Sequence, residues 1–182
     1  MQKIKVNLPS NLRTGGKFKG IFDIEIKDKL GNLISKSWAE NVITDEGLDS
    51  ILDVYLHAAT QLTTWYCVIF ETNTTPDGDT TYAVPVFTEW EAYDEATRPE
   101  YVEAASSSQS VTNSANKAVF TANATKTLYG AALVAGGTDA DTKGDAAGGG
   151  TMACAGLFGA SQPVVDDNVV NLTYTVTALD DA

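Results

Sequence analysis

The sequence has few of the residues that build disulfide frameworks, metal sites and catalytic triads, with two cysteines and one histidine among 182 residues. Cys67 and Cys154 supply neither a disulfide framework nor a metal-ligand spacing, and both lie in apolar runs, so we expect small buried side chains. His57 has no partner with which to form a triad or a metal site, and we expect a structural or surface role for it. We therefore expect no cofactor and no metal ligands.

The motifs of the common enzyme classes are also missing. There is no Gly-x-Ser-x-Gly, no glycine-rich phosphate loop followed by lysine, and no Cys–His pair close in sequence. Acidic pairs such as Glu89 with Glu91 and Asp94 with Glu95 raise the possibility of a glycosidase, which needs two carboxylates facing each other across its substrate. Adjacency in an acidic chain more simply indicates solvated faces, so we expect a protein that is not an enzyme.

One acidic run, residues 139–145, resembles the start of an EF-hand loop, with acids at the first and third positions and glycine at the sixth. Lys143 occupies the fifth position, and Gly150 stands at the twelfth, where a bidentate glutamate is required. We expect a polar loop tip here rather than a calcium site.

Long apolar stretches are absent as well. No run approaches the roughly 20 residues of a membrane span, and Met1 is followed by polar residues rather than by a signal sequence. We expect a product that stays soluble in the compartment where it is made and has no membrane partner.

Basic residues are half as numerous as acidic ones, 12 against 24, and they are unevenly placed. Residues 1–36 hold eight basic and three acidic residues, whereas the remainder holds four basic and 21 acidic residues. The acidic body should repel nucleic acid, because affinity for phosphates comes from clustered lysine and arginine. We expect no nucleic-acid partner.

The basic leading segment is a candidate for binding a partner. It could dock on an acidic protein surface, including that of a neighbouring copy, or its lysines could simply solvate an edge strand. The candidate partner-binding residues are Lys3, Lys5, Arg13, Lys17 and Lys19.

The chain length suits one domain of ordinary size. Residues 1–17 contain Pro9, Gly15 and Gly16 and are interpreted as an extended N-terminal arm. Residues 18–182 are interpreted as a single β-sandwich domain.

Residues 41–70 combine a capped helical pattern with a strand pattern. Thr44 is the expected N-cap, with Asp45 and Glu46 in the first turn. Apolar residues at spacings of three and four then predict a helix over about 45–59 whose packed face leads into a buried strand at 65–70. That face comprises Leu48, Ile51, Leu52, Tyr55 and Leu56.

The rest of the chain is dominated by strand patterns. Phe22, Ile24 and Ile26 alternate with acids, which predicts a half-buried strand paired with 33–38 in a hairpin. A second hairpin is expected between 117–123 and 127–134. Further strands are expected at 151–158 and 169–179, and loops at 104–116 and 135–151, the latter mobile by composition.

Residues 84–102 read as short apolar runs in which Pro85 and Pro99 restrict the backbone to strand starts, edges or irregular extended segments. The count of about eight to ten short strands and one helix predicts a mainly β protein, an antiparallel β-sandwich or jelly roll. Its tryptophans could stack on sugars, but we expect at least Trp38 and Trp65 to pack in the core.

The order of several segments carries a family resemblance. These are Asn-Val-Ile-Thr-Asp-Glu-Gly-Leu at 41–48, Trp65-Tyr66, Phe87-Thr88-Glu89 with Tyr93, Arg98-Pro99, Phe-Thr-Ala-Asn at 120–123, and Leu-Tyr-Gly-Ala-Ala-Leu at 128–133. In this order they resemble a group of small tailed-bacteriophage virion proteins of the capsid decoration, or cement, type. The resemblance covers most of residues 18–178. The family-matching positions are Asn41, Gly47, Trp65, Tyr66, Glu89, Tyr93, Arg98, Pro99 and Gly130.

The resemblance implies an oligomeric β-sandwich, a trimer before a dimer, that is made in the host cytoplasm and binds the major capsid protein at the virion surface. The chain departs from the pattern in its long 135–151 loop and at 166–168. The alternative is a phage tail or tail-fibre module that recognises a receptor or glycan through exposed aromatics between Trp90 and Tyr101. A hydrolase using the acidic pairs is the weakest of the three hypotheses.

Overall fold

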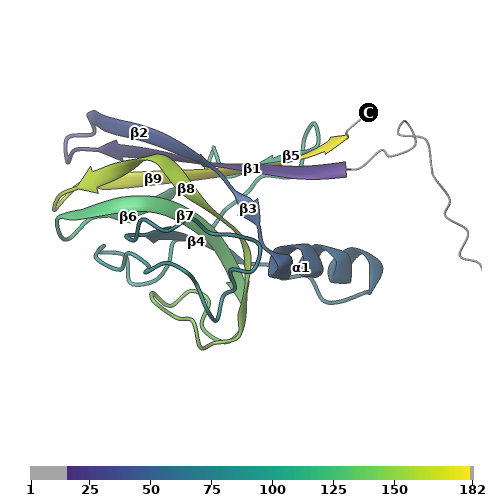
Figure 1. The fold of residues 1–182 in the computed structure, drawn as a ribbon. Helices are drawn as coiled ribbons and strands as arrows, with labels where there is room; N and C mark the ends of the chain where they lie inside the picture. Colours follow the sequence, from purple (N-terminus) through teal and green to yellow (C-terminus); the bar gives the residue numbers. More distant parts are fainter. Residues whose placement is uncertain (1–15, 181–182) are drawn as a thin grey trace, which may run out of the picture.

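The computed structural model describes residues 16–180, which form two antiparallel β-sheets packed face to face with one helix at the side (Figure 1). The elements are β1 (Gly16–Lys27), β2 (Leu33–Glu40), β3 (Val42–Ile43), α1 (Asp45–Leu56), β4 (Trp65–Phe70), β5 (Ser110–Thr112), β6 (Ala118–Thr121), β7 (Lys126–Gly136), β8 (Gly150–Val164) and β9 (Val169–Asp180). The predicted mainly β sandwich with one helix is confirmed.

The first sheet has the order β2-β1-β9, and both β5 and β6 pair with the other edge of β9. The predicted hairpin of β1 and β2 is present. Its turn is fixed by Asp28, whose carboxylate accepts hydrogen bonds from the backbone of Leu30 and Asn32, and by Gly31 at φ +86°. Because β1 begins at Gly16, Lys17 belongs to this strand and not to the arm assigned to residues 1–17.

The second sheet has the order β3-β8-β7-β4. The main core fills the space between the sheets, where the predicted inward face of β1, Phe22, Ile24 and Ile26, is fully buried. Cys67 and Ile69 of β4 face it from the second sheet. The alternation read from the sequence of β1 therefore correctly identifies its core face.

A second, smaller core lies on the outer face of the second sheet. Val68 and Phe70 of β4 point into it, opposite in direction to Cys67 and Ile69, and Tyr82 and Phe87 cover it from the segment that follows β4. Phe70 and Phe87 stack with ring centroids 4.2 Å apart. Burial on both faces explains why the β4 sequence is a continuous apolar run instead of an alternating one.

The segment after β4 is irregular but follows the free edge of that strand. Cys67 N–H donates to the Pro99 carbonyl at 2.8 Å, and Trp90 N–H donates to the Ile69 carbonyl at 2.8 Å. Pro85 and Pro99 both lie outside the named strands, which confirms the expectation of edge or irregular backbone for them. The segment also covers an edge of β4 that would otherwise be open for pairing with another strand.

Three expectations about elements are wrong. The predicted hairpin of 117–123 with 127–134 does not form, because β6 pairs with β9 in the first sheet while β7 pairs with β4 and β8 in the second. The 104–116 loop contains the short strand β5, which extends the first sheet. The helix ends at Leu56, three residues before the predicted end, with His57 as its C-cap.

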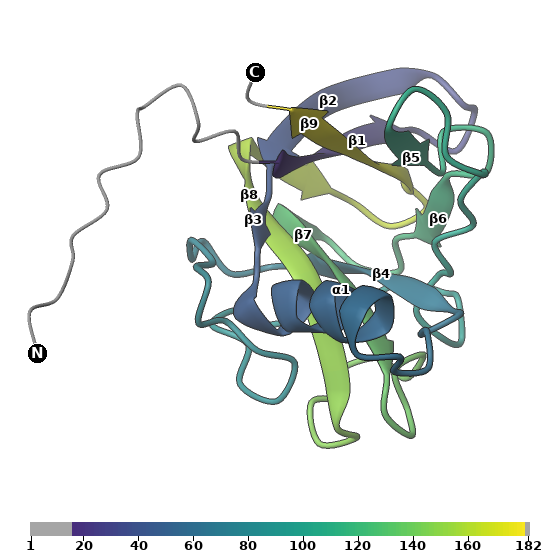
Figure 2. The ribbon, with the colours of Figure 1, turned by 90° about the vertical axis from the view of Figure 1, so that its right-hand side faces the viewer.

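The helix lies at one end of the sandwich. Figure 2 looks onto that end and shows α1 beside the second sheet, below the start of β1 and the end of β9. None of the helices in the described part of the chain is long and apolar enough to cross a membrane.

Candidate functional site

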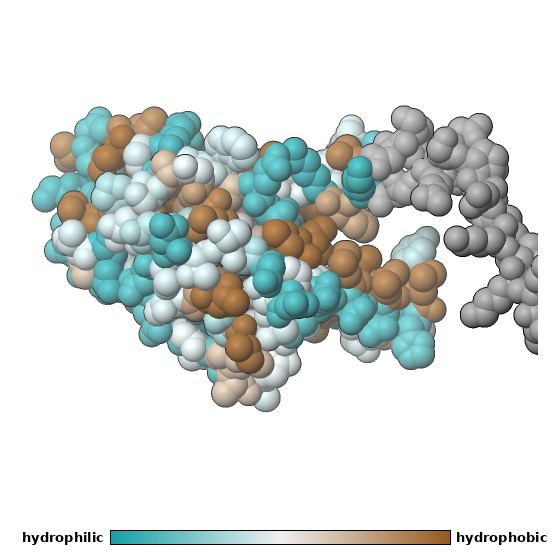
Figure 3. Space-filling view, viewed as in Figure 1, coloured by the Kyte–Doolittle hydropathy of each residue, from teal (hydrophilic) through white to brown (hydrophobic). Residues whose placement is uncertain are grey.

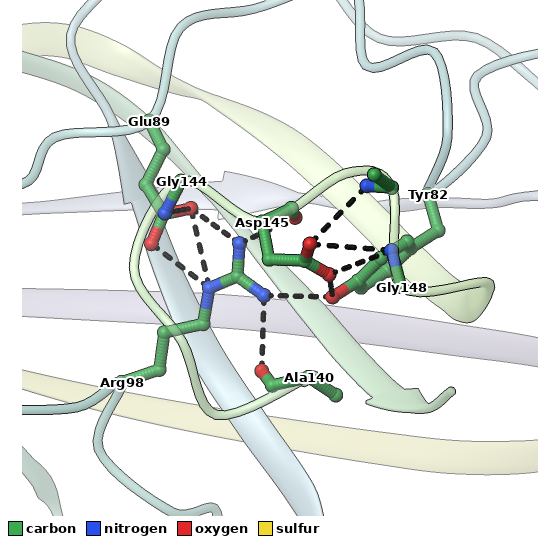
Figure 4. A network of polar contacts seen from close by, with 8 residues as sticks. Tyr82, Glu89, Arg98, Ala140, Gly144, Asp145 and Gly148 are labelled. Atoms are coloured by element: carbon green, nitrogen blue, oxygen red, sulfur yellow. Dashed lines mark hydrogen bonds and ion pairs between the residues drawn. The ribbon is translucent and has the colours of Figure 1, made fainter. Parts of the chain in front are cut away.

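A buried arginine, Arg98, holds together the loops that cover the second sheet (Figure 4). Its guanidinium forms a two-point ion pair with Glu89, with Nε 3.0 Å from Oε1 and Nη2 2.6 Å from Oε2. Nη1 donates to the Tyr82 hydroxyl at 3.2 Å and to the Ala140 carbonyl at 2.9 Å, and Nη2 donates to the Asp145 carbonyl at 2.9 Å. We call these five residues the Arg98 network.

The Arg98 network leaves no guanidinium donor without an acceptor. A guanidinium has five N–H donors, and each of those of Arg98 has an acceptor within the protein. The Tyr82 hydroxyl in turn donates to the Asp145 carboxylate at 2.6 Å, and Gly144 N–H donates to Glu89 at 2.9 Å. A pocket of about 240 Å³ lies beside the network. Arg98 has no donor left for a ligand there, and its hydrogen bonds fasten the loop between β7 and β8 to the segment that follows β4.

The expectation that Glu89 lies on a solvated face is wrong, because its side chain is only 8% exposed. Burial raises the pKa of Glu89, and the hydrogen bonds from Arg98 oppose that rise. Desolvation raises the pKa of Tyr82 to about 12, so its hydroxyl stays protonated and can donate to Asp145. The composition of the β7–β8 loop predicted mobility, but it did not show these attachments.

The aromatic residues between Trp90 and Tyr101 are buried. Trp90, Tyr93 and Phe120 pack together in the main core, and Tyr101 donates a hydrogen bond to the Tyr174 carbonyl at 3.2 Å. The Lys143 amino group lies 3.7 Å from the centroid of the Tyr93 ring and covers it. The expectation that this segment exposes aromatics to a glycan is therefore wrong.

Trp38 is more exposed than expected, whereas the aromatic residues between Trp90 and Tyr101 are more buried than expected. It was expected in the core, but its position on the outer face of β2 leaves it 55% exposed. A surface pocket of about 390 Å³ lies against it and includes Asp23, Glu25 and Lys36. Trp65, the other tryptophan expected in the core, is only partly buried, and it packs against the main core.

The apolar face of α1 is exposed, which contradicts the expectation that it packs in the core. Tyr55 is 85% and Leu56 74% exposed, and Leu48, Ile51 and Leu52 are also exposed. Figure 3 shows hydrophobic residues in brown along the side of α1 that faces β1.

Within residues 16–180, the hydrogen bonds that anchor α1 to the sandwich come from its N-cap and its first turn. The Thr44 side chain accepts a hydrogen bond from Gly47 N–H, as predicted for an N-cap, and its hydroxyl donates to the Met152 carbonyl. Glu46 accepts hydrogen bonds from the backbone N–H groups of Tyr82 and Met152, both at 2.9 Å. Beyond Gly47 the helix projects from the body, and this explains why a correctly predicted apolar stripe has no core to cover.

A groove separates β1 from α1. Its outer part has a volume of about 450 Å³ and its inner part about 170 Å³, and both parts are lined by Phe18 and Ile43. Leu48 and Leu179 add apolar surface to the outer part, and Ile51, Trp65 and Val176 add it to the inner part. We call this feature the β1–α1 groove.

The predicted basic partner-binding residues divide into two groups. Lys3, Lys5 and Arg13 lie outside the described residues. Lys17 and Lys19 lie in β1 and line the outer part of the β1–α1 groove, where Lys19 forms an ion pair of 2.7 Å with Glu40. Of the five predicted residues, the structure thus places Lys17 and Lys19 at the groove.

Most of the other family-matching residues have packing roles. Asn41 donates to the Tyr174 hydroxyl at 3.2 Å, where the chain leaves the first sheet for the second. Gly47 packs its backbone on Ala153, and Gly130 packs against Phe70. Tyr66 lies in β4 opposite Val134, and the Pro99 carbonyl accepts a hydrogen bond on the other edge of that strand.

The remaining candidate groups are the possible metal ligands, the two cysteines and the histidine. Within residues 16–180, no group of three or more histidine, cysteine or acidic side chains is placed to hold a metal ion. Cys67 and Cys154 are buried as predicted, and burial raises the pKa of both thiols, that of Cys154 to about 12. His57 lies at the exposed end of α1, which agrees with a surface role.

Comparisons with protein-family models, with curated proteins and with solved structures found no match to this chain.

Sequence reasoning missed the residues that form the most distinctive surface. Phe18 and Ile43 were not singled out, because Phe18 lies near the start of β1 and Ile43 ends the two-residue strand β3. Leu48 and Ile51 were identified, but as core residues. Tyr82 and Asp145 of the Arg98 network were also missed, because isolated polar residues in loops give no pattern that would place them together.

Proposed function

We propose that this protein is a structural component of a tailed-bacteriophage virion, a capsid decoration protein that binds the outer shell and stabilises contacts between capsomers. Two things support the proposal. One is the ordered set of segments that resembles small virion proteins, and the other is the exposed apolar surface of α1 and the β1–α1 groove. The proposal assigns the protein a binding role and no reaction.

The observation that carries the proposal is the exposure of large apolar side chains along α1. Monomeric soluble proteins rarely leave contiguous apolar patches uncovered, and such patches usually mark interaction sites. Leu48, Ile51, Leu52, Tyr55 and Leu56 form one exposed stripe along α1. Burial of this stripe by a protein partner would stabilise the complex, and the contact would recur at every copy of the chain.

The body that presents this surface is well braced. The Arg98 network fixes the loops on one side, and the first turn of α1 is hydrogen-bonded to β8. A preformed surface loses little conformational entropy on binding, and symmetry repeats each contact around a shell. The partners that the proposal names are the major capsid protein and further copies of this chain, with a trimer as the favoured oligomer.

The proposal is tested on virions of the phage that encodes this chain. Particles made without the protein should release their genome at a lower temperature than complete particles, and adding the purified protein back should restore the higher temperature. A Leu52→Glu and Leu56→Glu double variant should restore it poorly. Leu30→Glu is the matched control, because Leu30 is 80% exposed in the β1–β2 turn at the other end of the molecule. Equal release temperatures with and without the protein would contradict the proposal.

A second candidate function, a glycan-binding virion module, is favoured by Trp38. The exposed indole borders a pocket that also holds Asp23, Glu25, Lys36 and Lys117, and sugar sites commonly combine an aromatic face with charged hydrogen-bonding groups. A glycan array probed with the protein and with Trp38→Ala tests this function. Glycan binding by the native protein that is lost in Trp38→Ala would support this second function. No binding to the array would contradict it.

A further inference from the structure

The edge of β1 that borders the β1–α1 groove is open. Along its other edge β1 pairs with β9 from Gly16 to Lys27, but β2 pairs with β1 only from Ile21 onward. Among the described residues, no strand pairs with this edge at Phe18 or Lys19. The Gly20 carbonyl accepts a hydrogen bond from Asn41 N–H at 3.1 Å, so the polar groups of Gly20 point toward this edge.

The polar groups of Phe18 must point the same way, because backbone groups alternate between the two edges of an antiparallel strand. Phe18 therefore presents an N–H and a carbonyl to the groove. An extended peptide laid in the groove could pair with Phe18 and place alternate side chains on the apolar lining. Added strands bind proteins in this way, with the backbone giving affinity and the pockets giving selectivity.

The chain itself contains a segment that fits this site. At positions 3–8 the sequence reads Lys-Ile-Lys-Val-Asn-Leu, in which Ile4, Val6 and Leu8 alternate with polar residues, and Pro9 follows. Alternation places the three apolar side chains on one face of an extended segment. That face matches a groove lined by Phe18 and Ile43.

An antiparallel hairpin within one molecule would not place this segment at the site. If residues 1–15 turned back along β1 near Gly15, Leu8 would lie opposite Ile21 or beyond, where β2 already occupies the edge. A neighbouring copy has no such restriction. Seven residues separate Leu8 from Gly16 and can span about 25 Å when extended, which sets how close the two copies must be.

Charge also favours the segment over a second helix as the occupant. Residues 1–15 carry three basic residues and no acid, whereas α1 carries Asp45, Glu46, Asp49 and Asp53 and no lysine or arginine. Packing two copies of α1 together would bring like charges close, and docking the segment beside α1 brings opposite charges close. On the β1 side, Lys19 is already paired with Glu40.

We propose that residues 4–8 of a second copy of this chain bind as an added strand on the open edge of β1, with Ile4, Val6 and Leu8 in the β1–α1 groove. Reciprocal or cyclic exchange of this segment would join neighbouring copies. The inference deepens the proposed function by identifying a second copy of the chain as one of the partners. It rests on the proposed function only in placing this exchange on the virion shell.

Disulfide trapping between two different chains tests the exchange. A Val6→Cys chain is mixed with an isotopically labelled Ile51→Cys chain and mildly oxidised, and linked peptides are assigned by mass spectrometry. Because the two cysteines are on different molecules, any link between positions 6 and 51 joins two copies. The native Cys67 and Cys154 are buried and should not compete. The matched control replaces Ile51→Cys with Leu30→Cys, which is more exposed and far from the groove.

We expect at least ten times more linkage to position 51 than to position 30. Equal linkage at both positions, or none at position 51, would overturn the proposal. So would a double variant, Val6→Cys with Ile51→Cys, that links only within single molecules, because the occupant would then be the segment of the same chain.

A binding measurement without introduced cysteines is the second arm. A chain lacking residues 1–12 should be monomeric by sedimentation velocity and should bind a fluorescent peptide of residues 1–13, and Ile51→Ser should weaken that binding at least tenfold. A peptide that does not bind would contradict the exchange. Both experiments use purified protein and no virions. Their failure would therefore contradict the exchange without contradicting binding to the shell, which the heat-release experiment tests separately.

Discussion

At the scale of single residues, Arg98 shows how a buried charge can be structural and still resemble a functional site. It is charged, buried and next to a pocket, yet its five donors are all occupied and Glu89 neutralises it. The sequence placed Glu89 and Arg98 among the family-matching residues. It could not show that they meet, because eight residues of irregular chain separate them and Ala140 and Asp145 come from a different loop.

Replacing Arg98 with alanine should destabilise the protein by about 3–5 kcal/mol, because the substitution leaves Glu89 buried without a partner. Urea denaturation measures this loss of unfolding free energy. Lys126→Ala, which breaks the partly exposed 2.9 Å ion pair with Glu71, is the control and should cost less than about 1 kcal/mol. Similar losses for the two variants would show that the Arg98 network does not brace the loops.

Glu25 gives a prediction about pH. Hydrogen bonds from Lys117 and Lys36 lower the pKa of Glu25 from 4.5 to about 2. A carboxylate whose pKa is lower in the folded state stabilises the protein above pH 4.5, and this contribution disappears as the pH falls toward 2.

Because both lysines are exposed to solvent, we expect Glu25→Gln to lower the unfolding free energy by only about 1 kcal/mol at pH 6. That difference from the native protein should vanish near pH 2. Denaturation curves across this range measure it, with Asp23→Asn on the same face of β1 as the control. A difference that does not change with pH would mean that the two ion pairs contribute nothing.

At the scale of elements, α1 shows which properties of a helix periodicity predicts and which it does not. The Thr44 cap and the apolar stripe correctly predicted where the helix begins and that it is amphipathic. The stripe was assigned to the core because a periodic pattern identifies an apolar face without identifying what covers it. The same limit explains the wrong hairpin, since the patterns of β6 and β7 are both strand-like and only tertiary packing assigns them to different sheets.

Gly47 tests how α1 is attached. Glycine to alanine normally stabilises a helix interior by up to about 1 kcal/mol. Here an added Cβ would lie 2.2 Å from the Ala153 carbonyl oxygen, so Gly47→Ala should instead destabilise the protein by about 1–3 kcal/mol. Gly159→Ala, whose Cβ would come no closer than 3.8 Å to a neighbour, is the control. Stabilisation by Gly47→Ala in thermal unfolding would show that α1 is not packed on β8 at this point.

At the scale of the whole molecule, the apolar groove lies at the end of the sandwich from which α1 projects. The mainly β class followed from the many short strands, and the inner face of β1 followed from its alternation. The exposed surface around α1 could not be predicted, because it depends on how far the helix projects beyond the second sheet (Figure 1). That surface, with the open edge of β1, is where the proposed contacts to the shell and to neighbouring copies are made.

The number and position of copies on the intact virion test the central claim most directly. Quantitative mass spectrometry of purified particles, together with a cryo-electron microscopy map, gives both values. A decoration protein should be present in on the order of hundreds of copies, arranged on the outer shell with icosahedral symmetry. About a dozen copies or fewer, located at the tail, would contradict the account.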